Sequence, residues 1–115
     1  MGQAQKMFAD DEVVERHEDA GIDAWLTLLA NSDRRAMVSY LASIEQADGA
    51  SVGEIAFAAG ISRFSASRHL QMLRQAGLVD TRKSGNRVIV TLVAEPFRLI
   101  DDWLWRLVNA LGDVA

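Results

Sequence analysis

The sequence predicts a mainly α-helical fold with one small β-hairpin, and three observations lead to this class. Apolar residues recur at helical spacing in separate segments of the 115-residue chain. A polar and basic segment, 62–75, is stopped by Gly77. Two β-branched runs, 79–83 and 88–92, then flank a glycine-bearing tip at 84–87. Four helices, a hairpin and a fifth helix in this order are the plan of an α+β winged helix-turn-helix.

The first two helices are predicted from apolar spacing and a capping residue. Asn31 and Ser32 both offer a side-chain oxygen that caps a second helix. This helix is expected to end near Gln46, because residues 47–50 read as a turn. The helix before it, about residues 22–30, carries one apolar face made of Ile22, Trp25, Leu26 and Leu29.

The third and fourth helices are predicted from their caps. Ser51 and Glu54 have the spacing of a capping box, in which each side chain accepts a hydrogen bond from the other residue's backbone amide. Gly60 ends the third helix, and the short turn to Ser62 is typical of a helix-turn-helix. The inward face of the fourth helix is expected to consist of Ala66, Leu70 and Leu73.

The last helix is predicted to begin at Glu95-Pro96, because proline suits the first helical position. Its apolar residues cover more than one face, and one small domain cannot bury all of them. Residues 21–111 are expected to form a single domain, preceded by an acidic arm at residues 1–20. The apolar positions of the last helix are Phe97, Leu99, Ile100, Trp103, Leu104, Trp105, Leu107, Val108 and Leu111.

Charge is segregated along the chain, although the formal net charge of the whole is -4. Residues 60–91 hold six basic residues and one acidic residue, whereas residues 1–23 hold seven acidic and two basic residues. A DNA duplex carries about one negative charge per 1.7 Å, and it responds to the local field of the face that it meets. The basic segment therefore favours double-stranded DNA as the partner. The alternative is a protein-interaction module whose hairpin binds an acidic protein.

Composition argues against several other classes of protein. The chain has no cysteine, which excludes a disulfide scaffold, a thiolate metal site and a thiol nucleophile. It has no apolar run long enough for a membrane span and no signal-peptide pattern, so a cytoplasmic protein without a membrane partner is expected. No phosphate-binding glycine loop or nucleophile-and-base pair is evident, and we therefore expect neither an enzyme nor a cofactor.

Residues 24–108 resemble the ArsR-type winged-helix repressors of bacteria. The resemblance is carried by Ser67-Arg68-His69-Leu70, by Ala76-Gly77-Leu78-Val79 and by residues 28–35. It implies a homodimeric repressor that binds an inverted repeat through its recognition helix and wing, with the first and last helices forming the dimer interface. The chain is similar to a member that does not sense metal, because Asp101 and Asp102 have no histidine at ligand spacing. A small-molecule or protein effector is left open.

The predicted DNA contacts lie in the recognition helix and the wing. Arg63 is expected to reach either a base edge or a phosphate, and His69 is either a DNA contact or a structural hydrogen bonder. Phe64 is expected to pack against the preceding turn, with stacking at the sugar-phosphate edge as the alternative. The resemblance assigns Ser67, Arg68, His69, Arg82, Lys83 and Arg87 to DNA, and position on the helix adds Arg63, Ser65 and Gln71.

The predicted dimer interface combines the first and last helices. The three tryptophans either belong to its apolar core or line a small-molecule pocket. The assigned residues are Trp25, Leu29, Phe97, Ile100, Trp103, Leu104, Leu107 and Leu111.

Overall fold

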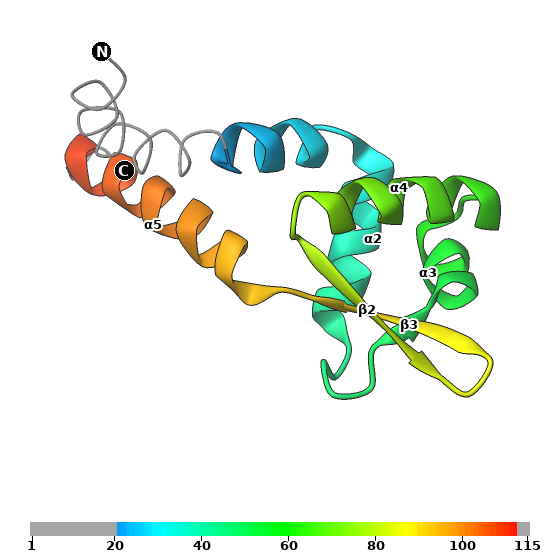
Figure 1. Cartoon of the computed structure of the whole chain (residues 1–115). Coiled ribbons are helices and arrows are strands. Elements are labelled where there is room, and N and C mark those ends of the chain that lie inside the picture. The colour runs from blue at the N-terminus through cyan, green and yellow to red at the C-terminus, as the bar shows by residue number, and fades with distance from the viewer. Residues whose placement is uncertain (1–20, 113–115) are drawn as a thin grey trace, which may run out of the picture.

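The computed structural model describes residues 21–112 and has the predicted mainly helical fold with a small wing (Figure 1). The predicted acidic arm lies outside the described residues. A first helix, residues 21–29, leads into the other elements. These are α2 (Ser32–Ser43), β1 (Ala50–Ser51), α3 (Val52–Ala59), α4 (Arg63–Gln75), β2 (Val79–Ser84), β3 (Arg87–Leu92) and α5 (Ala94–Leu111).

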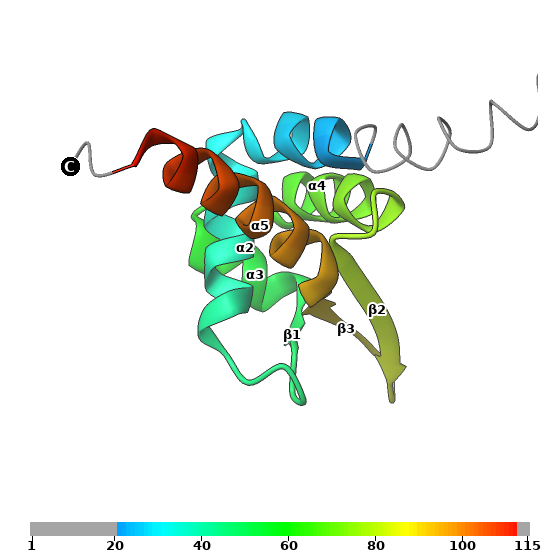
Figure 2. The same cartoon turned by 90° about the vertical axis from the view of Figure 1, so that its left-hand side faces the viewer.

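The core lies where α2, α3 and α4 meet the sheet. Its largest fully buried side chains are Met37, Leu41, Ile55, Leu73, Leu78, Val79 and Val90. The antiparallel sheet has the strand order β1-β3-β2, and β2 and β3 extend beyond the helices as the wing (Figure 2). No helix within residues 21–112 is both long and apolar enough to span a membrane.

The predicted helix caps are confirmed. The Asn31 side chain accepts a hydrogen bond from the Arg34 amide at 3.0 Å, and Ser62 Oγ accepts one from the Ser65 amide at 3.0 Å. Gly77 has a φ of +80° after the end of α4, as the stop signal predicts. Helix α5 begins at Ala94, so proline takes its third position instead of the predicted first. That position still lies in the first turn, where the missing amide has no helical partner to lose.

The segment between α2 and α3 differs from the sequence prediction. Helix α2 ends at Ser43, before the predicted end at Gln46. The side-chain amide of Gln46 instead donates to the Leu41 carbonyl at 2.6 Å, and its oxygen accepts from the Leu92 amide at 3.0 Å. Residue Ala50, expected in a turn, is paired with Val90 in β1. The sheet therefore has a third strand, which fixes the base of the wing to the helices.

Gly49 allows the chain to enter β1 at close range to β3. Its φ is +65°, and an added Cβ would lie 2.5 Å from Ile89 Cγ2 and 2.7 Å from the Val90 carbonyl oxygen. Gly60 has a similar φ of +70°, but an added Cβ there would meet nothing within 4 Å. The two glycines therefore share the left-handed backbone and differ in the space around them.

We expect Gly49→Ala to lower the free energy of unfolding by about 1–3 kcal/mol more than Gly60→Ala, since only the first change forces atoms into a packed neighbour. Both variants bear the strain of a left-handed residue, roughly 1–2 kcal/mol. Urea unfolding followed by tryptophan fluorescence measures the difference. Equal losses in the two variants would contradict the packing argument.

Candidate nucleic-acid interface

Helix α4 buries one face and exposes the opposite one. Ala66, Leu70 and Leu73 are buried in the core, which confirms the predicted inward face. The residues on the opposite side, at spacings of i, i+4, i+7 and i+11, are all exposed. We call this face the outer ridge; it consists of Phe64, Arg68, Gln71 and Gln75.

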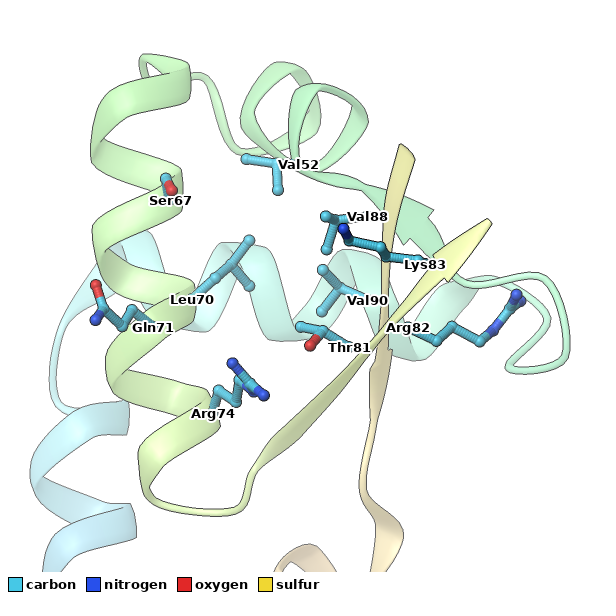
Figure 3. Close-up of a pocket in the computed structure, with 10 residues that line it drawn as sticks. All are labelled: Val52, Ser67, Leu70, Gln71, Arg74, Thr81, Arg82, Lys83, Val88 and Val90. Carbon is cyan, nitrogen blue, oxygen red and sulfur yellow. The ribbon is translucent and has the colours of Figure 1, made fainter. Parts of the chain in front are cut away.

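A groove of about 500 Å³ runs between α4 and the wing. Ser67, Gln71 and Arg74 border it from α4, and Thr81 and Lys83 border it from β2 (Figure 3). The apolar part of this wing groove is formed by Val52, Leu70, Val88 and Val90. A channel lined by hydroxyl, amide and cationic groups above an apolar floor suits a sugar-phosphate backbone.

Arg74 is a residue of the wing groove that the sequence-based site omitted. It follows Ser67 by seven residues, which places both on the same face of the helix. The sequence alone could therefore have placed Arg74 on the same face of the helix as the predicted DNA contact Ser67.

Arg82 and Lys83 lie on opposite faces of the hairpin. Val79 is buried against the core, so strand alternation directs Thr81 and Lys83 to the same side as Val79. Arg82 borders the wing groove, but its guanidinium points away from α4 (Figure 3). It donates to the carbonyls of residues 47 and 48 at 2.9 and 3.2 Å. Arg82 therefore ties the wing to the turn after α2, a role the sequence-based prediction did not give it.

Arg87 also has an intramolecular partner. Its Nη2 donates to Glu54 Oε1 at 2.6 Å, with both side chains more than half exposed. Glu54 completes the predicted capping box, because the same oxygen accepts from the Ser51 amide at 3.1 Å. Hydrogen bonds from the Ser51 hydroxyl and backbone amide lower the pKa of Glu54, with the charge of Arg87 as a further cause. The pair joins the hairpin to the first turn of α3.

Arg63 is the first residue of α4 and lies near the wing tip. With Arg87 it borders a hollow of about 320 Å³ beside the first turn of α3. Gly85, with a φ of +63°, and Asn86 form the two-residue turn at that tip. The exposed Arg63 therefore faces the same hollow as the Arg87 guanidinium, which is paired with Glu54.

His69 makes the structural hydrogen bond that the sequence left as an alternative to DNA binding. Its Nδ1 lies 3.1 Å from Nη1 of Arg34, whose Nε donates to the Leu28 carbonyl at 2.6 Å. A guanidinium only donates, so Nδ1 accepts and Nε2 carries the proton of the neutral ring. Arg34 thereby connects the first helix, α2 and α4. Ser65, another predicted DNA contact, is half-buried and lies one helical turn before His69 on α4.

Phe64 corrects a sequence-based expectation. The side chain was expected to pack against the preceding turn, but it is 71% exposed. Phe64 precedes the buried Ala66 by two residues, about 200° around the helix, and therefore points away from the core onto the outer ridge. The guanidinium carbon of Arg68 lies 5.8 Å from the centroid of its ring.

The residues predicted for a dimer interface fall into two groups. Two of them, Trp25 and Ile100, make contacts within the chain. Trp25 packs on the core, and its Nε1 donates to the Ala76 carbonyl at 2.8 Å. Ile100 is buried. Leu29, Phe97 and Trp103 are half-buried, whereas Leu104, Leu107 and Leu111 are exposed. Trp105, which the prediction placed in the interface core or a pocket, and Val108, which it did not assign, are also exposed.

Comparisons with known proteins agree with this geometry. Residues 29–82 match a helix-turn-helix domain family, while a search of curated protein sequences gave no match. The crystal structure of an ArsR family transcriptional regulator has a TM-score of 0.65 at 24% identity and shows the fold, covering 87% of this chain and 96% of its own.

Two further structures are similar in sequence as well. HlyU from Vibrio cholerae, in its reduced form, is 30% identical with a TM-score of 0.62, over 81% of this chain and 94% of HlyU. A homodimeric winged helix-turn-helix DNA-binding domain from Mycobacterium bovis, a possible ArsR-family regulator, is 28% identical with a TM-score of 0.61, over 88% and 86% of the two chains. The chain belongs to the ArsR family.

This ArsR-family protein is a DNA-binding transcriptional regulator, and its relatives are regulators, not enzymes. Within residues 21–112, no three histidine, aspartate or glutamate side chains come together in a way that could hold a metal ion. Asp101 and Asp102 are exposed on α5.

We expect the stabilising effect of Glu54 to depend on pH. Because folding lowers its pKa, the charged carboxylate adds stability above the ordinary value of 4.5, and this contribution is lost as pH falls through the folded-state pKa. The difference in unfolding free energy between the wild type and Glu54→Gln should therefore shrink on acidification below 4.5. Urea unfolding at a series of pH values measures it. Glu95→Gln, which removes an acid outside any capping box, is the control. If the difference in unfolding free energy between the wild type and Glu95→Gln falls equally below this pH, the pH dependence does not arise from the hydrogen bonds and charge around Glu54.

Proposed function

We propose that this regulator is a homodimeric repressor that binds an inverted-repeat operator. Each outer ridge would enter a major groove, with the two ridges about 34–36 Å apart on one side of the duplex. The observation that carries the proposal is the exposed outer ridge of α4 flanked by the cationic wing groove.

The charges of the site support contact with one DNA strand at the wing. Arg74 and Lys83 lie on the two sides of the wing groove, and no salt bridge within residues 21–112 occupies either of them. Ser67 adds a hydroxyl donor on the same side of α4. A strand laid along the groove would present phosphates to these three side chains, while the bases face the outer ridge.

A continuous apolar stripe on α5 supports the dimer. Its members follow the alternating spacing of three and four residues that is typical of a helix-helix seam. The first two, Phe97 and Ile100, pack on the chain's own domain, and the stripe continues where α5 extends away from α2 and α4 (Figure 1). There Leu104, Leu107 and Leu111 are 46%, 46% and 68% exposed. Complete burial of an exposed leucine contributes about 1.5–3 kcal/mol, so covering the exposed part of each of these leucines would contribute roughly 0.7–2 kcal/mol, which favours a second copy against this face.

The sequence favours a regulator that does not sense metal, because the chain has no cysteine and no histidine stands at ligand spacing from Asp101 and Asp102. Repression would follow if the bound dimer blocks polymerase, and release would require an effector that favours another spacing of the two α4 helices.

Selection of duplexes from a randomised pool, followed by footprinting, tests the proposal. The expected result is an inverted repeat protected in two symmetric blocks about one helical turn apart. A single asymmetric block, bound by one chain, would overturn it. Failure to bind random duplex even at low salt would favour the protein-interaction alternative.

We expect Arg74→Ala and Lys83→Ala each to reduce the slope of log affinity against log salt by about 0.9, the loss of one phosphate contact. Arg82→Ala is the matched control, because it removes the same charge from the opposite face of the wing. Fluorescence anisotropy over a range of salt concentrations gives the slopes. If Arg82→Ala lowers the slope as much as Lys83→Ala does, the wing groove is not the path of the strand.

The double variant Leu104→Asp and Leu107→Asp is expected to convert the dimer to a monomer, because two unpaired carboxylates would be buried in the seam. Light scattering coupled to size exclusion measures the mass. Phe57→Asp is the control, since Phe57 is 91% exposed on α3. It should leave the dimer intact. A dimer that persists in the double variant would place the seam elsewhere.

A further inference from the structure

Phe64 differs from other exposed apolar residues in its position. Single apolar side chains on a surface are common, and Phe57 on α3 is an example. Phe64 is the second residue of α4 and lies on the outer ridge, in the part of a recognition helix that reaches base edges. With the outer ridge in a major groove, as proposed above, an aromatic ring at this place would face base edges.

Arg68 lies one helical turn after Phe64 and is stacked on it. The distance of 5.8 Å between its guanidinium carbon and the ring centroid is within cation-π range. Stacking limits the positions that the guanidinium can occupy, so less conformational entropy is lost when its planar fork binds a partner. The ring thus preorganises the Arg68 guanidinium for a bidentate hydrogen bond, compared with an arginine that is not stacked.

The surface next to this pair has a mixed character. Phe64, Ser65, Arg68, His69 and Met72 border a shallow hollow of about 220 Å³. The ring and the thioether make part of it apolar, and the guanidinium and hydroxyl make part of it polar. In the major groove, thymine is the base that presents a methyl group, and guanine presents two acceptors, O6 and N7, that match an arginine fork.

Building on the proposed function, we propose that Phe64 and Arg68 form one reading unit that selects a thymine and a nearby guanine in each half-site. Phe64 contacts the 5-methyl group of thymine, and Arg68 donates two hydrogen bonds to O6 and N7 of guanine. Four helical residues rise about 6 Å, and base pairs are about 3.4 Å apart, so the two bases lie within two base pairs of each other.

Single-atom changes in the DNA test this unit. The probe is the duplex that the wild-type protein selects from a randomised pool, with each thymine in turn replaced by deoxyuridine and each guanine by 7-deazaguanine. At one thymine per half-site, loss of the methyl group should weaken wild-type binding about fourfold, the effect of one buried methyl group. At one guanine within two base pairs of it, loss of N7 should weaken binding about fivefold or more.

Variants assign each effect to its residue. Phe64→Ala should lose the deoxyuridine penalty, whereas Phe64→Leu should keep it, because leucine still offers an apolar contact but no ring for Arg68. Arg68→Ala should lose the 7-deazaguanine penalty and retain the methyl effect. Phe57→Ala, the matched change of an exposed phenylalanine off the outer ridge, should retain both penalties. Circular dichroism confirms that each variant is folded.

The outcomes separate the reading unit from the proposed function. A wild-type protein that selects an operator but is insensitive to every deoxyuridine, or a Phe64→Ala variant that keeps the penalty, overturns the reading unit and leaves the repressor proposal standing. A wild-type protein that binds all duplexes equally overturns both.

Discussion

The burial of one stripe of α4 is the constraint on which the DNA face depends. Ala66, Leu70 and Leu73 fill the space between α2, α3 and the sheet, and removing a buried leucine from such a core costs about 2–5 kcal/mol. Rotating α4 by one residue, about 100°, would withdraw this stripe and turn polar side chains inward. The direction of the outer ridge is therefore fixed by packing on the far side of the same helix. The side chains of the outer ridge therefore do not set the direction in which the ridge points.

Local features of this fold were readable from the sequence, and contacts between distant segments were not. The capping box of Ser51 and Glu54 involves residues three apart, so its pattern is visible in the chain itself. Strand β1 depends on pairing with β3 some forty residues later, and Arg34 meets His69 across 35 residues. The exposure of Phe64 is different, because it follows from local spacing: Phe64 precedes the inward Ala66 by two residues and so lies on the opposite side of the helix.

Helix α5 explains why a domain of this size carries so many apolar residues. The sequence is 50% hydrophobic, and the core of the described domain covers only the beginning of the α5 stripe. One uninterrupted helix thus starts as part of the core and ends as an apolar surface. The sequence pattern shows that the apolar stripe exists. The rest of the domain determines which residues of the stripe are buried, because α5 extends beyond the elements that cover its first turns. This is why Ile100 and Leu104, equal members of the predicted interface, differ in the structure.

The first helix is fastened to α4 at two points. Trp25 reaches the carbonyl of Ala76 at the end of α4, and Arg34 joins the Leu28 carbonyl to His69 near its middle. Two separated hydrogen-bonded links resist sliding of the first helix along α4, and the second link also includes α2 through Arg34. A change in the position of the first helix would therefore have to break one of these hydrogen bonds or carry α4 with it.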